Sequence, residues 1–212
     1  DPDTDTFIAP MPITVVGLDS RYAYDLNRAP DQAVFDEAWG RKVWSRPLNR
    51  EERQRSLARH RRFYEVMAAL VGEIERRFGG CVVYDIHSYN WKRWDRPVPT
   101  FNIGSERLDP KWGPEVDAFA AQLTEQELPH EIDTACTVND VFMGRGYNLA
   151  FISERFHNTL VLATEVKKVY CDEETGERYP VITRTLQQVF KQAIVSHAWE
   201  FAKRHTRYSS PE

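Results

Sequence analysis

One long amphipathic segment, which ends at two glycines directly before a short apolar run, constrains the fold of this sequence most strongly. Between residues 49 and 78, apolar residues recur every three or four positions, namely Phe63, Met67, Leu70, Ile74 and Phe78. Asn49 is a typical N-cap residue, and Gly79 with Gly80 ends the helical pattern. The sequence therefore predicts a helix over 49–78, followed by a buried strand with the sequence "CVVYDIHS".

The remaining pattern alternates strands and helices. "ITVVGL" (13–18) and "SRYAYDL" (20–26) resemble neighbouring strands, although the second carries many charges for a strand. Later strands are expected at 100–105, 134–138 and 158–166, and helices at 114–128 and 180–203. This alternation predicts an α/β fold with a largely buried sheet.

Composition limits the class of protein. A chain of 212 residues with 42% hydrophobic residues is long enough for one sizeable core, so we expect one domain over 1–212. A net charge of −4 gives no basic field for nucleic acid. No apolar run approaches the roughly 18 residues of a membrane span, which argues against a membrane protein. Three cysteines in no CxxC arrangement indicate a reducing cytoplasm.

The first residues, "DPDTDTFIAP", lack a methionine and lead within a dozen residues to a strand-like segment. We therefore expect that an N-terminal segment of the natural protein precedes Asp1.

Polar side chains gather where predicted strands end. "YAYDLNR" ends in Asp25, Asn27 and Arg28, "CVVYDIHS" ends with His87, and "LVLATEVKK" carries Glu165. Because open α/β sheets bind ligands beyond the carboxyl ends of their strands, these residues are candidates for one site. Together they supply a carboxylate clamp, a metal ligand and an acid or base, as in a metallohydrolase.

Each candidate also has an ordinary structural interpretation. A histidine that closes a strand is more often structural than a metal ligand, although the nearby Asp85 favours a ligand. Glu165 alone fits a surface carboxylate beside Lys167 and Lys168. In the charged segment 19–28, Arg21 and Arg28 fit an ion-pair network with the neighbouring Asp19 and Asp25.

The order and wording of these motifs resemble the N-formylglutamate amidohydrolase family, which is related to aspartoacylase, succinylglutamate desuccinylase and the zinc carboxypeptidases. The resemblance is carried by "SRYAYDLNRAP", "YDIHSYN", "FNIGS", "NDVFMGRGY" and "ATEVKKVY". It implies a three-layer α/β/α fold with a mixed central sheet, as in zinc carboxypeptidases.

The resemblance also implies residue roles. Asn27 and Arg28 would bind the substrate carboxylate, with Ser88 and Arg145 as further substrate-binding candidates. Arg21 would stabilise the oxyanion, and Glu165 would be the general base that activates water. His87 and Asp1 would bind one zinc ion, with Asp5 a poorer candidate than Asp1.

Two features depart from the family pattern. No residue matches the family's first metal histidine, which lies upstream of the Asp-rich start, so the zinc site is expected to be incomplete in this chain. Arg145 stands where the family has paired glycines, and the extra charge could mean a different acyl group.

The resemblance implies a zinc-dependent hydrolase of N-formyl-L-glutamate that acts in the cytoplasm, in histidine degradation. The alternatives are hydrolysis of another N-acyl amino acid or a small peptide, and a non-catalytic relative that binds carboxylates without a metal.

Overall fold

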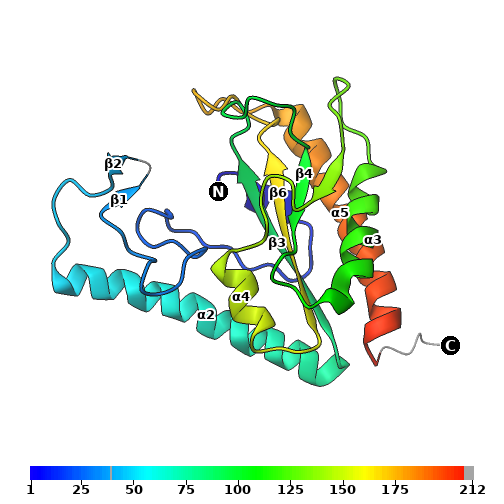
Figure 1. Ribbon diagram of the computed structural model, residues 1–212, viewed down its shortest axis with the longest axis horizontal. Coiled ribbons are helices and arrows are strands. Elements are labelled where there is room, and N and C mark those ends of the chain that lie inside the picture. Colours follow the sequence, from blue (N-terminus) through cyan, green and yellow to red (C-terminus); the bar gives the residue numbers. More distant parts are fainter. Residues whose placement is uncertain (39, 208–212) are drawn as a thin grey trace.

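A mixed sheet with helices on both faces forms the centre of the computed structural model, which describes residues 1–38 and 40–207 (Figure 1). In this part of the chain the sheet has four strands, in the order β3 (Cys81–Tyr89), β6 (Thr159–Lys167), β4 (Phe101–Gly104) and β5 (Cys136–Val138). β3 is parallel to β6, β6 is antiparallel to β4, and β4 is parallel to β5. The predicted α/β fold with a mixed central sheet is confirmed.

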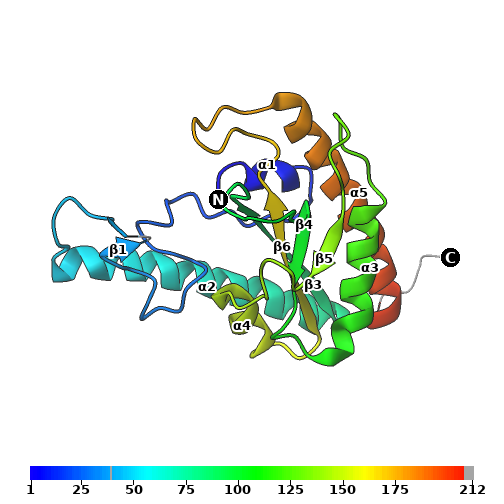
Figure 2. The same ribbon diagram turned by 45° about the horizontal axis from the view of Figure 1, so that its top comes forward.

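The helices form the two outer layers. One face of the sheet is covered by α2 (Arg50–Phe78) and α4 (Tyr147–Ser153), and the other by α3 (Gly113–Thr124) and α5 (Pro180–His205) (Figure 1). The short α1 (Thr4–Ile8) packs against α5 and β3 (Figure 2). A 3₁₀ turn, Pro110–Trp112, precedes α3, and a small hairpin pairs β1 (Glu37–Ala38) with β2 (Arg41–Lys42).

Each face of the sheet has its own apolar core. The core beneath α3 and α5 is the larger, and it contains fully buried residues such as Phe119, Leu186 and Phe190. The core beneath α2 and α4 includes Tyr64 and Ile152. Burial of these side chains on both faces explains why the strand sequences are nearly continuous apolar runs.

The predicted start and end of α2 are confirmed. The Asn49 side chain accepts a hydrogen bond from the Glu52 backbone N–H, and the Glu52 carboxylate accepts one from the Asn49 N–H, each at 2.9 Å. This reciprocal capping box satisfies two backbone donors that a helix start leaves unpaired. Gly79 ends the helix with φ of 82°, a left-handed conformation that glycine adopts without steric cost.

The two strands predicted at 13–18 and 20–26 are wrong. Both segments are irregular, and in the second one short-range hydrogen bonds to polar side chains replace a strand ladder. The Ser20 hydroxyl accepts the Tyr22 N–H, and the Asp25 carboxylate accepts the Asn27 N–H. The charged residues that were unusual for a strand are therefore the ones that form turns.

The helices and the cysteines bear on the class of protein. Within residues 1–38 and 40–207, no helix has both the length and the apolar character needed to cross a membrane. Cys81, Cys136 and Cys171 are all free thiols.

A buried carboxylate joins α3 to the end of α5. Glu115 is only 4% exposed, and it accepts hydrogen bonds from Arg204 at 2.8 and 3.0 Å and from His205 at 2.8 Å. Burial acts to raise the pKa of Glu115, but the hydrogen bonds from Arg204 and His205 outweigh it and lower this pKa overall. The ionised form of Glu115 is therefore the one that stabilises the fold.

We expect Glu115→Gln to lower the free energy of unfolding by about 1–3 kcal/mol at pH 7, because a hydrogen-bonded buried charge is lost. A carboxyl group whose pKa is lowered in the native state contributes stability above its unfolded pKa and loses it as the pH falls. The difference from wild type, measured by urea unfolding, should therefore shrink between about pH 5 and pH 3. Glu200→Gln, which breaks an exposed pair with Lys203, is the control and should cost under about 1 kcal/mol. A pH-independent difference for Glu115→Gln would contradict this assignment.

Candidate functional site

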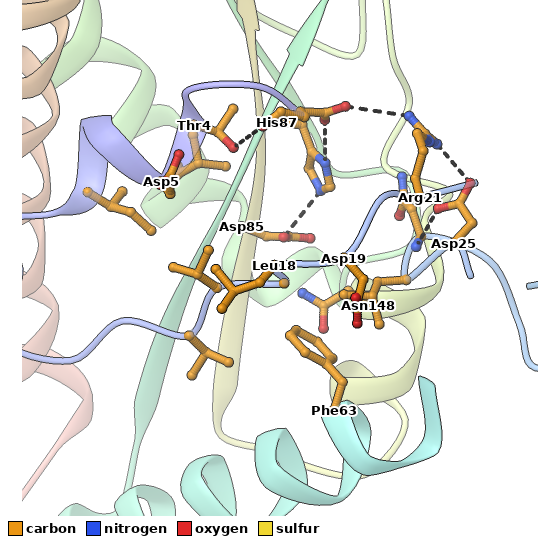
Figure 3. Close-up of a pocket in the computed structure, with 18 of the residues that line it drawn as sticks. Thr4, Asp5, Leu18, Asp19, Arg21, Asp25, Phe63, Asp85, His87 and Asn148 are labelled. Carbon is orange, nitrogen blue, oxygen red and sulfur yellow. Dashed lines mark hydrogen bonds and ion pairs between the residues drawn. The ribbon is translucent and has the colours of Figure 1, made fainter. Parts of the chain in front are cut away.

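A cavity of about 380 Å³ lies beside the second half of β3. Its walls come from the first residues of the chain, the irregular segment 15–27, β3, two residues of α2 (Phe63 and Tyr64) and one of α4 (Asn148) (Figure 3). Four residues that the sequence predicted as functional line it together: Asp1, Arg21, Asn27 and His87.

His87 lies between two carboxylates. Its Nδ1 is 3.2 Å from Oδ2 of Asp1, and its Nε2 is 3.2 Å from Oδ1 of Asp85 (Figure 3). Burial acts to lower the pKa of His87, but Asp85 and Glu165 outweigh it and raise this pKa to about 9. The imidazole ring therefore sits where a positive charge is strongly favoured.

Asp85 orients the ring, and Asn148 holds Asp85. Residues two apart on a strand share a face but need not touch; here Asp85 and His87 do touch. Burial acts to raise the pKa of Asp85, but its interactions with His87 and with the Asn148 side chain lower this pKa overall. Sequence reasoning missed Asn148, whose only signal was one amide within the apolar segment "YNLAFIS".

A single buried carboxylate holds both arginines of the charged segment. Oδ2 of Asp25 lies 2.9 Å from Arg21 and 3.3 Å from Arg28, and its Oδ1 accepts the Asn27 N–H at 2.9 Å. The Asp25 side chain is 3% exposed, whereas each arginine side chain is 38% exposed. Arg21 also lies 3.5 Å from Asp1, so it reaches the side of the cavity where His87 lies.

A close approach of two backbone segments places Asn27. A Cβ atom at Gly146 would stand 2.0 Å from the Asn27 Oδ1, so any larger residue would displace Asn27. The Tyr147 N–H also donates to the Asn27 carbonyl at 3.2 Å. The "GRGY" motif thus has a steric reason for its second glycine.

Glu165 is the register partner of His87 in the parallel pairing of β3 with β6. Paired residues of neighbouring strands project to the same face, so these side chains are neighbours. The two lysines proposed as surface partners of Glu165 bond elsewhere: Lys167 donates to the Val98 carbonyl and Lys168 to the Asn90 side chain. Burial raises the pKa of Glu165, with His87 acting against it.

Four predicted site residues do not line the cavity, namely Arg28, Ser88, Arg145 and Glu165. The Ser88 side chain is buried on the face of β3 opposite to His87, although its N–H donates to Asp1 at 3.3 Å. Arg145 forms an exposed ion pair with Glu106 at 2.8 Å. Asp5 lines the cavity from α1, whereas Asp1 is the carboxylate in contact with His87.

The donor atoms present fit part of a zinc site. Tetrahedral zinc with bonds of about 2.0–2.1 Å separates two ligand atoms by about 3.3 Å, close to the 3.2 Å between Asp1 and His87. A carboxylate on the other ring nitrogen, as Asp85 provides, is the usual support of a metal-binding histidine. Among the described residues, however, no group of three His, Cys, Asp or Glu side chains could hold a metal ion.

The buried position of Asp25 generates a stability prediction. We expect Asp25→Asn to lower the free energy of unfolding by about 1–3 kcal/mol, because the charged partner of two half-exposed arginines is removed. Asp36→Asn is a matched control, since Asp36 also pairs with an arginine, Arg53, but its side chain is 67% exposed. The control should change stability by under about 1 kcal/mol in urea unfolding. Equal costs for the two variants would show that burial of Asp25 contributes nothing.

Known proteins resemble this chain in sequence and in fold. Residues 1–168 match the model of the family described as N-formylglutamate amidohydrolase. An N-formylglutamate amidohydrolase from Ralstonia eutropha JMP134 has a similar structure, with a TM-score of 0.63 and 20% identity over 84% of this chain and 73% of that one. A gene product from Agrobacterium tumefaciens aligns with a TM-score of 0.55 and 18% identity over 83% and 68% of the two chains. No curated protein matches. The chain belongs to the N-formylglutamate amidohydrolase family.

Proposed function

We propose that this protein is a zinc-dependent amidohydrolase that cleaves N-formyl-L-glutamate to formate and L-glutamate. The observation that carries the proposal is the meeting, at one cavity, of the His87 and Asp1 pair with Arg21 and Asn27. Family membership supports the reaction class, and the substrate takes its name from the family and from the related structure of Ralstonia eutropha.

Binding of the substrate would use the charged segment. Asn27 and Arg28 would hold a carboxylate of glutamate, because a planar guanidinium donates two parallel N–H groups to one carboxylate. Arg28 contacts Asp25 through Nε, and we assign its terminal N–H groups to the substrate. The exposed fraction of its side chain, 38%, leaves it accessible to a ligand.

Hydrolysis would use Arg21 and Glu165. Asp1 and His87 would hold the zinc ion, which when bound supplies a Lewis acid for the formyl carbonyl. Glu165 would take a proton from the attacking water as the water oxygen adds to the formyl carbon. Arg21 would donate hydrogen bonds to the oxygen that becomes negative. Glu165 would then return the proton to the amine nitrogen as the C–N bond breaks, which releases formate and glutamate.

The reaction and the metal can be tested together. We expect the purified protein to release formate from N-formyl-L-glutamate, to lose this activity on chelation and to regain it with zinc. His87→Ala should lower zinc content and activity together, because few protein ligands hold the ion. His157→Ala, in a loop elsewhere, is the control and should leave both unchanged. Hydrolysis that is indifferent to chelation would refute the zinc assignment, and absence of formate release by zinc-loaded protein would refute the substrate.

The role of Glu165 makes a separate prediction. Glu165→Gln keeps the size of the side chain but removes its basicity, so turnover should fall by roughly 10²- to 10⁴-fold while zinc and substrate still bind. Glu154→Gln, an exposed position at the end of α4, is the control and should leave turnover unchanged. Steady-state kinetics with calorimetric substrate binding would measure both effects. Near-wild-type turnover in zinc-loaded Glu165→Gln would exclude Glu165 as the base.

A further inference from the structure

Three consecutive backbone carbonyls in the charged segment each accept a hydrogen bond from the layer formed by α2 and α4. The Tyr64 hydroxyl donates to the carbonyl of Leu26. The Tyr147 N–H donates to that of Asn27 at 3.2 Å, and the His60 Nε2 donates to that of Arg28 at 3.0 Å. The backbone that carries Asn27 and Arg28 is thus attached to the helices at each step.

The side chains of His60 and Tyr64 are buried in an aromatic cluster. His60 is 1% and Tyr64 is 4% exposed. Their ring centres lie 4.9 Å apart, and the Tyr64 ring lies 4.8 Å from that of Tyr147 and 4.6 Å from that of Phe151. Because a carbonyl oxygen only accepts, the Nε2 of His60 must carry a hydrogen. Burial lowers the pKa of His60, which favours the neutral ring with that hydrogen.

These bonds add to those made by Asp25. Asp25 contacts the guanidinium groups of Arg21 and Arg28 and accepts the Asn27 N–H, whereas Tyr64 and His60 donate to the main-chain carbonyls of Leu26 and Arg28. A main-chain shift of a fraction of an ångström at Asn27 moves its side-chain amide by at least as much. The Gly146 contact leaves little room for such a shift on the other side.

We propose that Tyr64 and His60 are positioning residues that hold the main chain of Asn27 and Arg28 in the geometry for substrate carboxylate binding. This inference rests on the proposed function. Tyr64 also lines the cavity, but its hydroxyl is bonded to the Leu26 carbonyl, so we assign both residues an indirect role through the main chain of Asn27 and Arg28. Their loss should weaken substrate binding in the ground state and the transition state alike, which raises KM and leaves kcat nearly unchanged.

The aromatic cluster contains its own control. Tyr64→Phe removes only the hydroxyl that bonds to Leu26 and keeps the ring in place. Tyr147→Phe makes the same chemical change in the same cluster, but Tyr147 bonds to Asn27 through its main chain, and within the described residues its hydroxyl has no hydrogen-bond partner. A difference between the two variants therefore reports the hydrogen bond and not the packing.

The experiment compares full-length wild type, Tyr64→Phe, Tyr147→Phe and His60→Gln, with N-formyl-L-glutamate as the substrate. Amide hydrogen exchange of peptides that cover residues 24–30 is measured in parallel, because it does not require activity. For Tyr64→Phe we expect KM to rise about three- to tenfold, kcat to change less than about twofold, and exchange at 24–30 to accelerate. Tyr147→Phe should match wild type, and His60→Gln, which can still donate a hydrogen bond, should lie between them.

Equal KM values and equal exchange in Tyr64→Phe and Tyr147→Phe would overturn the inference, as would a loss confined to kcat. Failure of the proposed function is distinguishable from failure of this inference. If the wild-type protein neither hydrolyses nor binds N-formyl-L-glutamate, the proposed function fails. Unchanged hydrogen exchange at residues 24–30 in Tyr64→Phe would refute the positioning role, whatever the substrate.

Discussion

The parallel pairing of β3 with β6 is the constraint on which the arrangement of the candidate site depends. The two strands pair residue for residue over their nine positions, from Cys81 with Thr159 to Tyr89 with Lys167. This register sets His87 beside Glu165 on one face of the sheet. A slip of one residue would turn Glu165 to the opposite face, because side chains alternate along a strand. The apolar residues buried on both faces of β6 therefore also determine which carboxylate faces the histidine.

The charged segment before α2 shows how one interaction can serve both folding and binding. Burial of the Asp25 carboxylate is costly unless its oxygens are paired, and Arg21, Arg28 and the Asn27 N–H provide the partners. The same contacts hold the guanidinium groups of Arg21, which lines the cavity, and of Arg28. Hydrogen bonds from α2 side chains and from the Tyr147 N–H of α4 to main-chain carbonyls of the turn complete the arrangement. The segment is polar because turns and ligands need donors and acceptors that a packed strand would not supply.

Much of the fold was predictable from local pattern, and each error has a physical cause. The helix α2 followed from its apolar spacing, the Asn49 cap and the glycine stop, and the apolar runs correctly predicted β3 and β6. Strands were wrongly predicted at 13–18 and 20–26, because a strand needs a partner and alternation alone does not supply one. The short helices α1 and α4 were missed, since five and seven residues are too few to show a helical period.

Caps and periodicity defined the long helices and the buried strands, and the order of "DLNR", "DIHS" and the strand-borne glutamate indicated the family. Tertiary structure alone decided which of these residues meet. Asp1 contacts His87 across 86 positions of sequence, Asn148 reaches Asp85 from another layer, and Tyr64 bonds the turn that holds the clamp. Such contacts depend on the sheet register and on how α2 and α4 pack against it. Residue spacing along the chain carries no information about which surfaces will face each other once both cores are buried.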